Sequence, residues 1–154
     1  MNQLRVTIAT EPNTKSESFQ CVFDWLREHN WQAAGTFMQA MSDIGFAAAP
    51  LILTAQIDGN VIGGVVAETQ LAWLKTSILS VDPNHRRLGV GTKLMNQAES
   101  IAIQRGCRHA YVDTLSHQAP EFYQSIGYQV AGEIDDWDSH GHTKLFLTKQ
   151  LDDQ

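Results

Sequence analysis

The chain of 154 residues contains only two cysteines, Cys21 and Cys107, which are far apart in the sequence. Their separation argues against a disulfide framework and a cysteine-ligated metal, and two reduced thiols are typical of a cytoplasmic protein. No apolar run approaches membrane-spanning length, and the first residues lack the apolar core of a signal peptide. We therefore expect a cytoplasmic protein that does not bind a membrane.

Positive charge is also scarce, because 11 Lys and Arg residues face 17 Asp and Glu residues and the net charge is −6. This balance argues against general nucleic-acid binding. The chain lacks internal repeats and low-complexity linkers, and its hydrophobic content of 43% is ordinary for a globular protein. Its length suits one domain, so we expect residues 1–154 to form a single unit.

Periodicity and turn signals predict an α/β protein with a mixed sheet of about seven strands and flanking helices. A capping box at Thr14 and Glu17 is expected to open the first helix, which would end near Asn30. A second helix would end near Gly45. The remaining elements are strands at 6–8, 51–57, 61–67, 71–81, 109–114, 128–134 and 143–148, with helices at 92–105 and from 120 to about 127.

Two of these elements carry further expectations. Asp58-Gly59 suits the tight turn of a hairpin between the strands 51–57 and 61–67. The strand Leu71–Val81 has no clean alternation, which fits either burial on both faces or a β-bulge.

The most informative segment is Val81–Thr92, in which a strand ends, two arginines follow, and Gly89-Val90-Gly91 precedes a helix. Unpaired N–H groups at a helix start favour an anion, and arginines add charge-assisted hydrogen bonds. Such a loop can equally be a tight turn with a solvated Arg-Arg pair. It lacks the spacing of a Walker loop and the third glycine of a dinucleotide fingerprint.

Two segments together resemble the GNAT superfamily of acyl-CoA-dependent N-acyltransferases. Arg86-Arg87-Leu88-Gly89-Val90-Gly91 is similar to the family's acyl-CoA loop, [Arg/Gln]-x-x-Gly-x-[Gly/Ala]. Residues 119–128, Ala-Pro-Glu-Phe-Tyr-Gln-Ser-Ile-Gly-Tyr, are similar to its Ala-x-x-[Leu/Phe]-Tyr-x-x-x-Gly-[Phe/Tyr] segment. The order of elements from Val6 to Thr148 also fits, so the resemblance covers nearly the whole chain.

The resemblance implies acetyl-CoA as co-substrate, wedged in a V-shaped splay between strands four and five, 71–81 and 109–114. Pantetheine would pair with backbone near Leu79, Ser80 and Val81. The pyrophosphate would lie on amides from Arg87 to Thr92, which include those of Leu88, Gly89, Val90 and Gly91, with Arg86 beside them. An amine would attack the thioester directly, and Tyr123 would donate a proton to the leaving thiolate. The alternative for Tyr123 is packing against its neighbours in a short helix.

Two positions depart from the family pattern. A glutamate that serves some members as general base is Lys75 here, so we consider Glu68, acting through a water, as the base. Glu68 can equally be a solvated charge at a hairpin end, and His117 is a further candidate that can equally be an ordinary loop residue. The family's asparagine contact to pantetheine is replaced by Ser116, whose hydroxyl is shorter.

The acceptor is expected to be a small-molecule amine, although a protein amine and a non-catalytic acyl-CoA-binding module stay as alternatives.

Residues 135–142 partly mimic a calcium loop, but Leu147 stands where the bidentate glutamate belongs. We therefore interpret them as a polar hairpin loop and expect no metal. Trp73 or Trp137, with Phe37, could form an apolar wall for the acceptor, whereas core packing is the default. Dimers are common in the family, which leaves a homodimer open.

Overall fold

The computed structural model describes residues 5–44 and 47–151. The chain divides into two compact units, one up to residue 45 and one from residue 46 onward, and each is described by itself. Among the described helices, none is both long enough and apolar enough to cross a membrane.

The first unit contains one helical element, α1 (Glu17–Ile44), which is interrupted at Ala34 by the non-helical angles φ −146° and ψ 47°. Two helices were predicted, and the break lies four residues later than the expected end at Asn30, directly before Gly35. The difference arises because no helix breaker follows Asn30 until that glycine, so the backbone ladder continues. The predicted end at Gly45 lies outside the described residues.

The predicted strand at Val6–Ile8 is absent from the described residues, which have no regular structure between positions 5 and 11. Val6 and Ile8 are exposed, and a strand without a partner leaves its backbone groups unpaired. The predicted capping box also does not form. Thr14 instead accepts a hydrogen bond at its backbone oxygen from Gln20 Nε2, at 2.7 Å.

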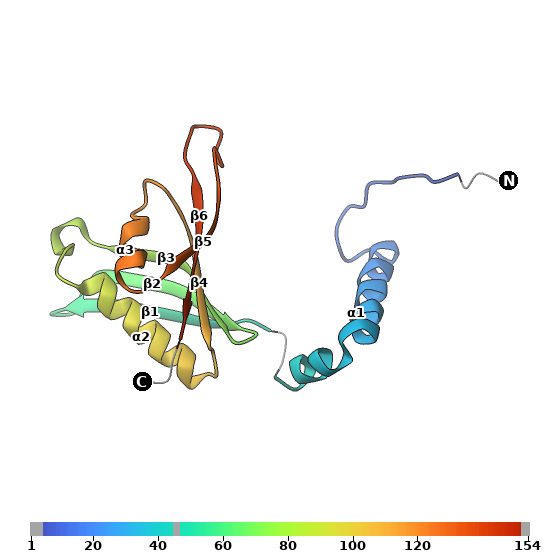
Figure 1. The fold of residues 1–154 in the computed structure, drawn as a ribbon, viewed down its shortest axis with the longest axis horizontal. Coiled ribbons are helices and arrows are strands. Elements are labelled where there is room, and N and C mark those ends of the chain that lie inside the picture. Colours follow the sequence, from blue (N-terminus) through green and yellow to red (C-terminus); the bar gives the residue numbers. More distant parts are fainter. Residues whose placement is uncertain (1–4, 45–46, 152–154) are drawn as a thin grey trace. The chain divides into compact units, whose positions relative to one another are not determined.

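The second unit contains a six-stranded mixed sheet, so the predicted α/β class is confirmed with one strand fewer than expected (Figure 1). The spatial order is β1-β2-β3-β4-β6-β5, and only the β3–β4 pair is parallel. The strands are β1 (Ala49–Ile57), β2 (Asn60–Gln70), β3 (Trp73–Val81), β4 (His109–Leu115), β5 (Gln129–Ile134) and β6 (Lys144–Gln150). The helices are the 3-10 turn η1 (Pro83–His85), α2 (Val90–Gln104) and α3 (Pro120–Ser125).

Two tight turns organise the first three strands. Asp58 (φ 50°) and Gly59 (φ 81°) form the predicted turn of the β1–β2 hairpin, in the backbone region that suits Asp-Gly. Leu71 and Ala72 also have positive φ and form the next turn, so β3 begins two residues later than predicted.

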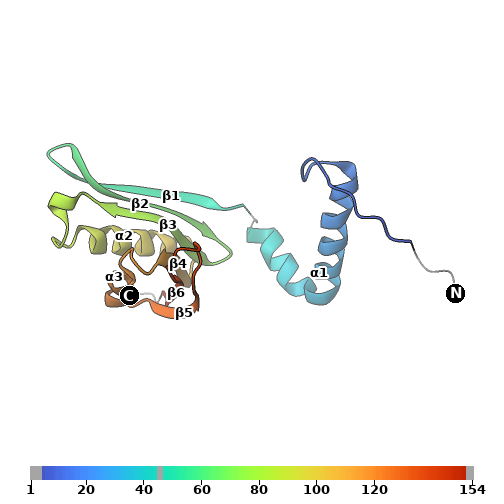
Figure 2. The same cartoon turned by 90° about the horizontal axis from the view of Figure 1, so that it is seen from above.

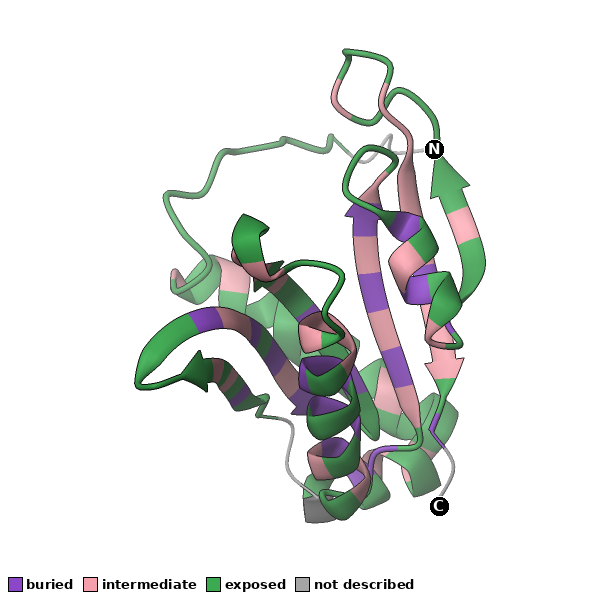
Figure 3. Cartoon of the chain, turned by 90° about the vertical axis from the view of Figure 1, so that its left-hand side faces the viewer, coloured by how far each residue is buried: buried purple, intermediate pink, exposed green. Residues whose placement is uncertain are grey.

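Helix α2 lies along one face of β1, β2 and β3 (Figure 2). Its buried stripe of Leu94, Met95, Ala98 and Ala102 enters the core, together with Leu74 of β3. Strand β4 alternates buried and half-buried residues along its whole length (Figure 3). Burial of the apolar stripe of α2 stabilises the fold by about 25 cal/mol for each Å² removed from water. This packing fixes α2 on the sheet and therefore fixes the position of its N-terminus.

The parallel pair β3–β4 separates along its length. Hydrogen-bonded register runs only from Trp73 opposite His109 to Thr76 opposite Val112, whereas β3 continues to Val81. The β2–β3 register shifts at this point and leaves Ser77 as a bulge, which is one of the two alternatives that the irregular pattern of the strand left open. The expected splay therefore exists, and the end of β3 has a free backbone edge on its β4 side.

Candidate active site

A cleft of about 820 Å³ opens beside this free edge. Its walls are the end of β3, the loop that follows, the first turn of α2, and the segment that enters α3. The lining residues are Leu79, Ser80, Val81, His85, Arg86, Arg87, Gly89, Val90, Gly91, Thr92, His117, Gln118, Ala119, Phe122 and Tyr123. Two segments about thirty residues apart in the sequence thus form a single site.

The loop between β3 and α2 is held by a local hydrogen-bond network. Asp82 accepts the backbone N–H of Asn84 at 2.9 Å and lies 3.2 Å from His85 Nδ1. The bond from Asn84 lowers the pKa of Asp82, and His85 lowers it further. Desolvation has the opposite effect but is outweighed. The Arg86 side chain donates from Nε to the backbone oxygen of Val81 at 3.1 Å. These bonds fix where the loop leaves the strand.

The loop ends in two left-handed residues, Arg87 (φ 61°) and Gly89 (φ 76°). A left-handed arginine is uncommon, since the conformation is unfavourable for a residue with a Cβ. No side chain caps α2, and its first intrahelical bond runs from the N–H of Lys93 to the oxygen of Gly89 at 3.0 Å. The preceding amides therefore have no acceptor within the helix and can bind an anion.

Tyr123 lies at the opposite wall, 8% exposed. Its ring packs edge-on against Phe122 and Tyr128, with centroids 5.2 Å and 5.9 Å away. Burial raises the pKa of the Tyr123 phenol, and the negative charge of Asp113 raises it further. The phenol therefore keeps its proton at neutral pH.

Asp113 belongs to a network on β4 and β6. Lys144 Nζ lies 2.7 Å from one carboxylate oxygen, and Tyr111 donates its hydroxyl to the other at 3.1 Å. Desolvation opposes ionisation, but these two bonds outweigh it and lower the pKa of Asp113. Burial, the bond to Asp113 and its charge raise the pKa of Tyr111 to about 12. Asp113 is therefore a carboxylate at neutral pH.

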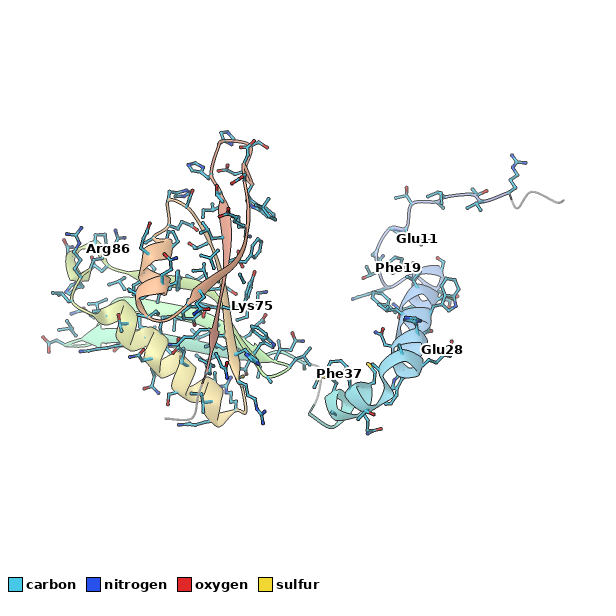
Figure 4. The ribbon with its side chains drawn as sticks, viewed as in Figure 1. Glu11, Phe19, Glu28, Phe37, Lys75 and Arg86 are labelled. Atoms are coloured by element: carbon cyan, nitrogen blue, oxygen red, sulfur yellow. The ribbon has the colours of Figure 1, made fainter. Side chains whose placement is uncertain are left out.

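The cleft brings together ten of the thirteen residues predicted for the site from the sequence, but the other three lie outside its lining. Leu88 is 65% exposed, and Ser116 is exposed with its N–H donating to the oxygen of Thr143 at 2.8 Å. Glu68 lies on β2 directly opposite Lys75 of β3, and their charged atoms are 3.7 Å apart. Figure 4 shows Lys75 on the sheet and Arg86 at the distant loop.

Sequence reasoning missed His85 and Gln118 as cleft residues. Gln118 Oε1 accepts the backbone N–H of Leu115 at 3.0 Å, and the hydroxyl of Thr114 lies 3.5 Å away. The bonded side chain fixes the loop between β4 and α3. In the sequence, the only indication of this role was that Gln118 is polar and directly precedes the second motif. That position alone does not predict the turn that its side chain stabilises.

Residues 135–143 connect β5 and β6, as the hairpin interpretation predicted. Among residues 5–44 and 47–151, no group of three or more His, Cys, Asp or Glu side chains could hold a metal ion. Trp137 is 50% exposed, and Lys144 Nζ lies 4.4 Å from its ring centroid. Trp73 stacks on His109 at 4.8 Å.

A splayed pair of parallel strands that ends in a basic glycine loop at a helix N-terminus is the α/β arrangement that the resemblance to the acyltransferases implied. The chain belongs to the acetyltransferase (GNAT) family, whose model matches residues 10–128. The resemblance in the two motifs therefore identified the family correctly.

Individual relatives agree with this assignment. The blasticidin-S acetyltransferase of Streptomyces morookaense is 39% identical over 94 residues, which cover 60% of this chain and 68% of the relative. A crystal structure of an acetyltransferase from Bacillus cereus matches with a TM-score of 0.73 and 28% identity, over 94% of this chain and 98% of that chain. An aminoglycoside 6'-N-acetyltransferase complexed with coenzyme A shares the fold, with a TM-score of 0.62 at 18% identity and coverage of 68% and 74%.

Proposed function

We propose that the protein transfers the acetyl group of acetyl-CoA to the amine of a small molecule. The observation that carries this proposal is the single cleft in which the glycine loop, the free edge of β3 and Tyr123 meet. The match of the family model to residues 10–128 spans parts of both units and supports one N-acetyltransferase domain over residues 1–154.

The donor would bind along the cleft by backbone contacts. Its diphosphate suits the unpaired amides from Arg87 to Thr92, and the guanidinium of Arg87 adds a charge-assisted bond. Pantetheine, with its two amides, suits the backbone of Leu79–Val81, which β4 leaves unpaired and which it would extend as an added strand once the Val81 oxygen is released by Arg86. We assign Leu88 to the loop's amide cradle and Ser116 to a pantetheine contact.

The reaction is a direct displacement. The neutral amine attacks the thioester carbonyl carbon, the new C–N bond forms, and the C–S bond breaks. Tyr123 donates its proton to the departing sulfur and recovers one from the acylated nitrogen. Positioning of two reactants and one proton donor can lower the barrier substantially without a covalent enzyme intermediate.

The acceptor class rests on relatives whose names specify small amines. Blasticidin S is the amine in the name of one relative, and that relative shares 39% identity with this chain. The net charge of −6 suits a cationic acceptor at long range. Glu68, beside Lys75, stays the sequence prediction for a base acting through water.

The test has two steps. Acetyl-CoA, compared with ATP and NAD, should stabilise the protein by about 2.7 kcal/mol at a hundredfold excess over its dissociation constant. Release of the free thiol is then measured with blasticidin S, spermidine, an aminoglycoside and an alanyl peptide. Binding without turnover of any amine would indicate an acyl-CoA-binding module. Turnover of the peptide alone would replace the small-molecule acceptor with a protein amine.

A further inference from the structure

The proposed reaction needs a proton acceptor, because amines are mostly protonated at neutral pH. Within the described part of the chain, the titratable or charged side chains that line the cleft are His85, Arg86, Arg87, His117 and Tyr123. Arginine does not give up its proton in proteins, and the raised pKa of Tyr123 keeps that phenol protonated. The two histidines are therefore the cleft side chains whose imidazole can serve as a general base.

His85 lies at the end of the cleft that is formed by the glycine loop, where the diphosphate of the donor would bind. It closes the turn η1, and its Nδ1 lies 3.2 Å from Asp82 Oδ2, within the network that fixes the glycine loop. Its neighbours Arg86 and Arg87 are permanent cations. A base placed there would face the diphosphate rather than the thioester.

His117 approaches from the other wall, in the connection between β4 and α3, six residues before Tyr123. Its ring packs against that of His142, with centroids 4.4 Å apart and planes at 61°. His142 in turn places Nδ1 2.6 Å from Asp138 Oδ2. A carboxylate and two imidazoles thus form a continuous row that reaches the cleft.

Asp138 is a fixed member of this row. Its Oδ1 accepts the backbone N–H groups of His140 and His142, at 3.0 Å and 3.3 Å. The bond from His142, together with those two amides, lowers the pKa of Asp138 to about 2, so the side chain is a carboxylate throughout the neutral range. A hydrogen bond to a carboxylate holds an imidazole in one tautomer and orientation.

The two loops that carry the row are joined by their backbones. The N–H of Ser116 donates to the oxygen of Thr143 at 2.8 Å and joins the two loops, whereas the N–H of Trp137 donates to the oxygen of His142 at 3.0 Å within the second loop. His117 and His142 are therefore held side by side by a main-chain bond between their sequence neighbours Ser116 and Thr143, and the contact does not depend on the imidazoles alone.

The other charged groups nearby have partners of their own. Asp135 accepts the Thr143 hydroxyl at 3.0 Å, and Asp136 accepts the N–H of Gly141 at 2.7 Å. His140 Nδ1 lies 2.7 Å from the backbone oxygen of Asp138. From the facing wall come His85, Arg86 and Arg87, and α3 adds Glu121 and Tyr123. Asp138 is the carboxylate in contact with an imidazole nitrogen of the row.

We propose that His117 takes the proton from the acceptor's ammonium group, and that His142 and Asp138 are positioning residues for it. This inference rests on the proposed acetyl transfer. The ammonium N–H bond breaks, the proton goes to an imidazole nitrogen of His117, and the freed lone pair attacks the thioester. His117 is exposed, so it returns that proton to bulk water. The second amine proton replaces the one that Tyr123 gives to the sulfur, which closes the proton balance.

The test compares pH profiles of kcat/KM, with blasticidin S, spermidine, an aminoglycoside and the alanyl peptide as probes. For the amine that wild type acetylates, His117→Gln should lower kcat/KM about 100-fold near pH 7, the size typical of a general base. The loss should shrink to about threefold near pH 10, because much of the amine is then already neutral. The dissociation constant of coenzyme A should stay unchanged.

Two further variants separate a positioning role from a structural one. Asp138→Asn, which retains an oxygen for the backbone amides, should shift the acidic inflection of the profile. His140→Gln, a histidine substitution in the same loop, should leave both the inflection and kcat/KM as in wild type.

The result that overturns the inference is an active wild type whose pH profile is unaltered by His117→Gln. A Glu68→Gln variant that loses the acidic inflection would assign the base to Glu68 instead. Wild-type protein that acetylates none of the four amines would overturn the proposed function itself, which makes the two failures distinguishable.

Discussion

A Cβ atom on Gly91 would lie 3.3 Å from the ring of Phe122, so the first turn of α2 meets α3 so closely that any side chain there would push Phe122 away. This contact joins the two sequence motifs in space. It places the amides of the glycine loop and the phenol of Tyr123 in the walls of one cleft. A larger residue at position 91 would therefore disturb both ends of the donor site.

We predict that Gly91→Val weakens acetyl-CoA binding. The side chain would displace Phe122, which lines the cleft together with the glycine loop. Overpacking of this kind costs about 1–3 kcal/mol of folding stability. We expect the affinity for coenzyme A to fall about tenfold, which corresponds to about 1.4 kcal/mol of binding free energy. Titration calorimetry with coenzyme A measures the effect. Gly132→Ala is the control, because a Cβ there meets nothing within 4 Å. Unchanged affinity in Gly91→Val would refute the close approach.

We predict that Tyr123→Phe lowers kcat about 100-fold and leaves the dissociation constant of coenzyme A near normal, because the phenol acts only when the thiolate leaves. Tyr128→Phe is the matched control, since its ring packs on Tyr123 but does not line the cleft. Rapid quench of a single turnover checks that the chemical step is observed. Equal rates for Tyr123→Phe and wild type would remove the acid role.

Sequence reasoning succeeded where the determining signal is local. The Asp58-Gly59 turn, the apolar stripe of α2 and the glycine loop each lie within a few residues, and each has one favoured local conformation. It failed at Val6–Ile8, because strand formation depends on a partner that the residues themselves do not specify. It also could not show that His142 packs on His117, which depends on the register of Leu115 opposite Lys144.

We expect Asp138 to contribute to the fall in the free energy of unfolding at acidic pH. The bond from His142 lowers its folded pKa to about 2, below the unfolded value near 3.9. Between these values the unfolded chain binds more protons, so this contribution is fully present above about pH 4 and is lost as pH falls toward 2. Asp138→Asn should flatten the pH dependence of the melting temperature in this window. A profile as steep as that of wild type would show that Asp138 does not contribute.

Lys149 of β6 and Glu99 of α2 form an ion pair, and their charged atoms are 2.7 Å apart. The Glu99 side chain is only 9% exposed, so its charge depends on the cation of Lys149 beside it. Lys149→Met should lower the free energy of unfolding by about 3 kcal/mol, because it leaves a carboxylate buried without a cation. Adding Glu99→Leu to Lys149→Met should restore most of the loss, since an apolar pair of similar volume removes the unpaired charge. Urea denaturation of the wild type, both single variants and the double variant measures the coupling. Additive losses, with the double variant least stable of all, would show that packing by the lysine stem rather than charge pairing holds β6 to α2.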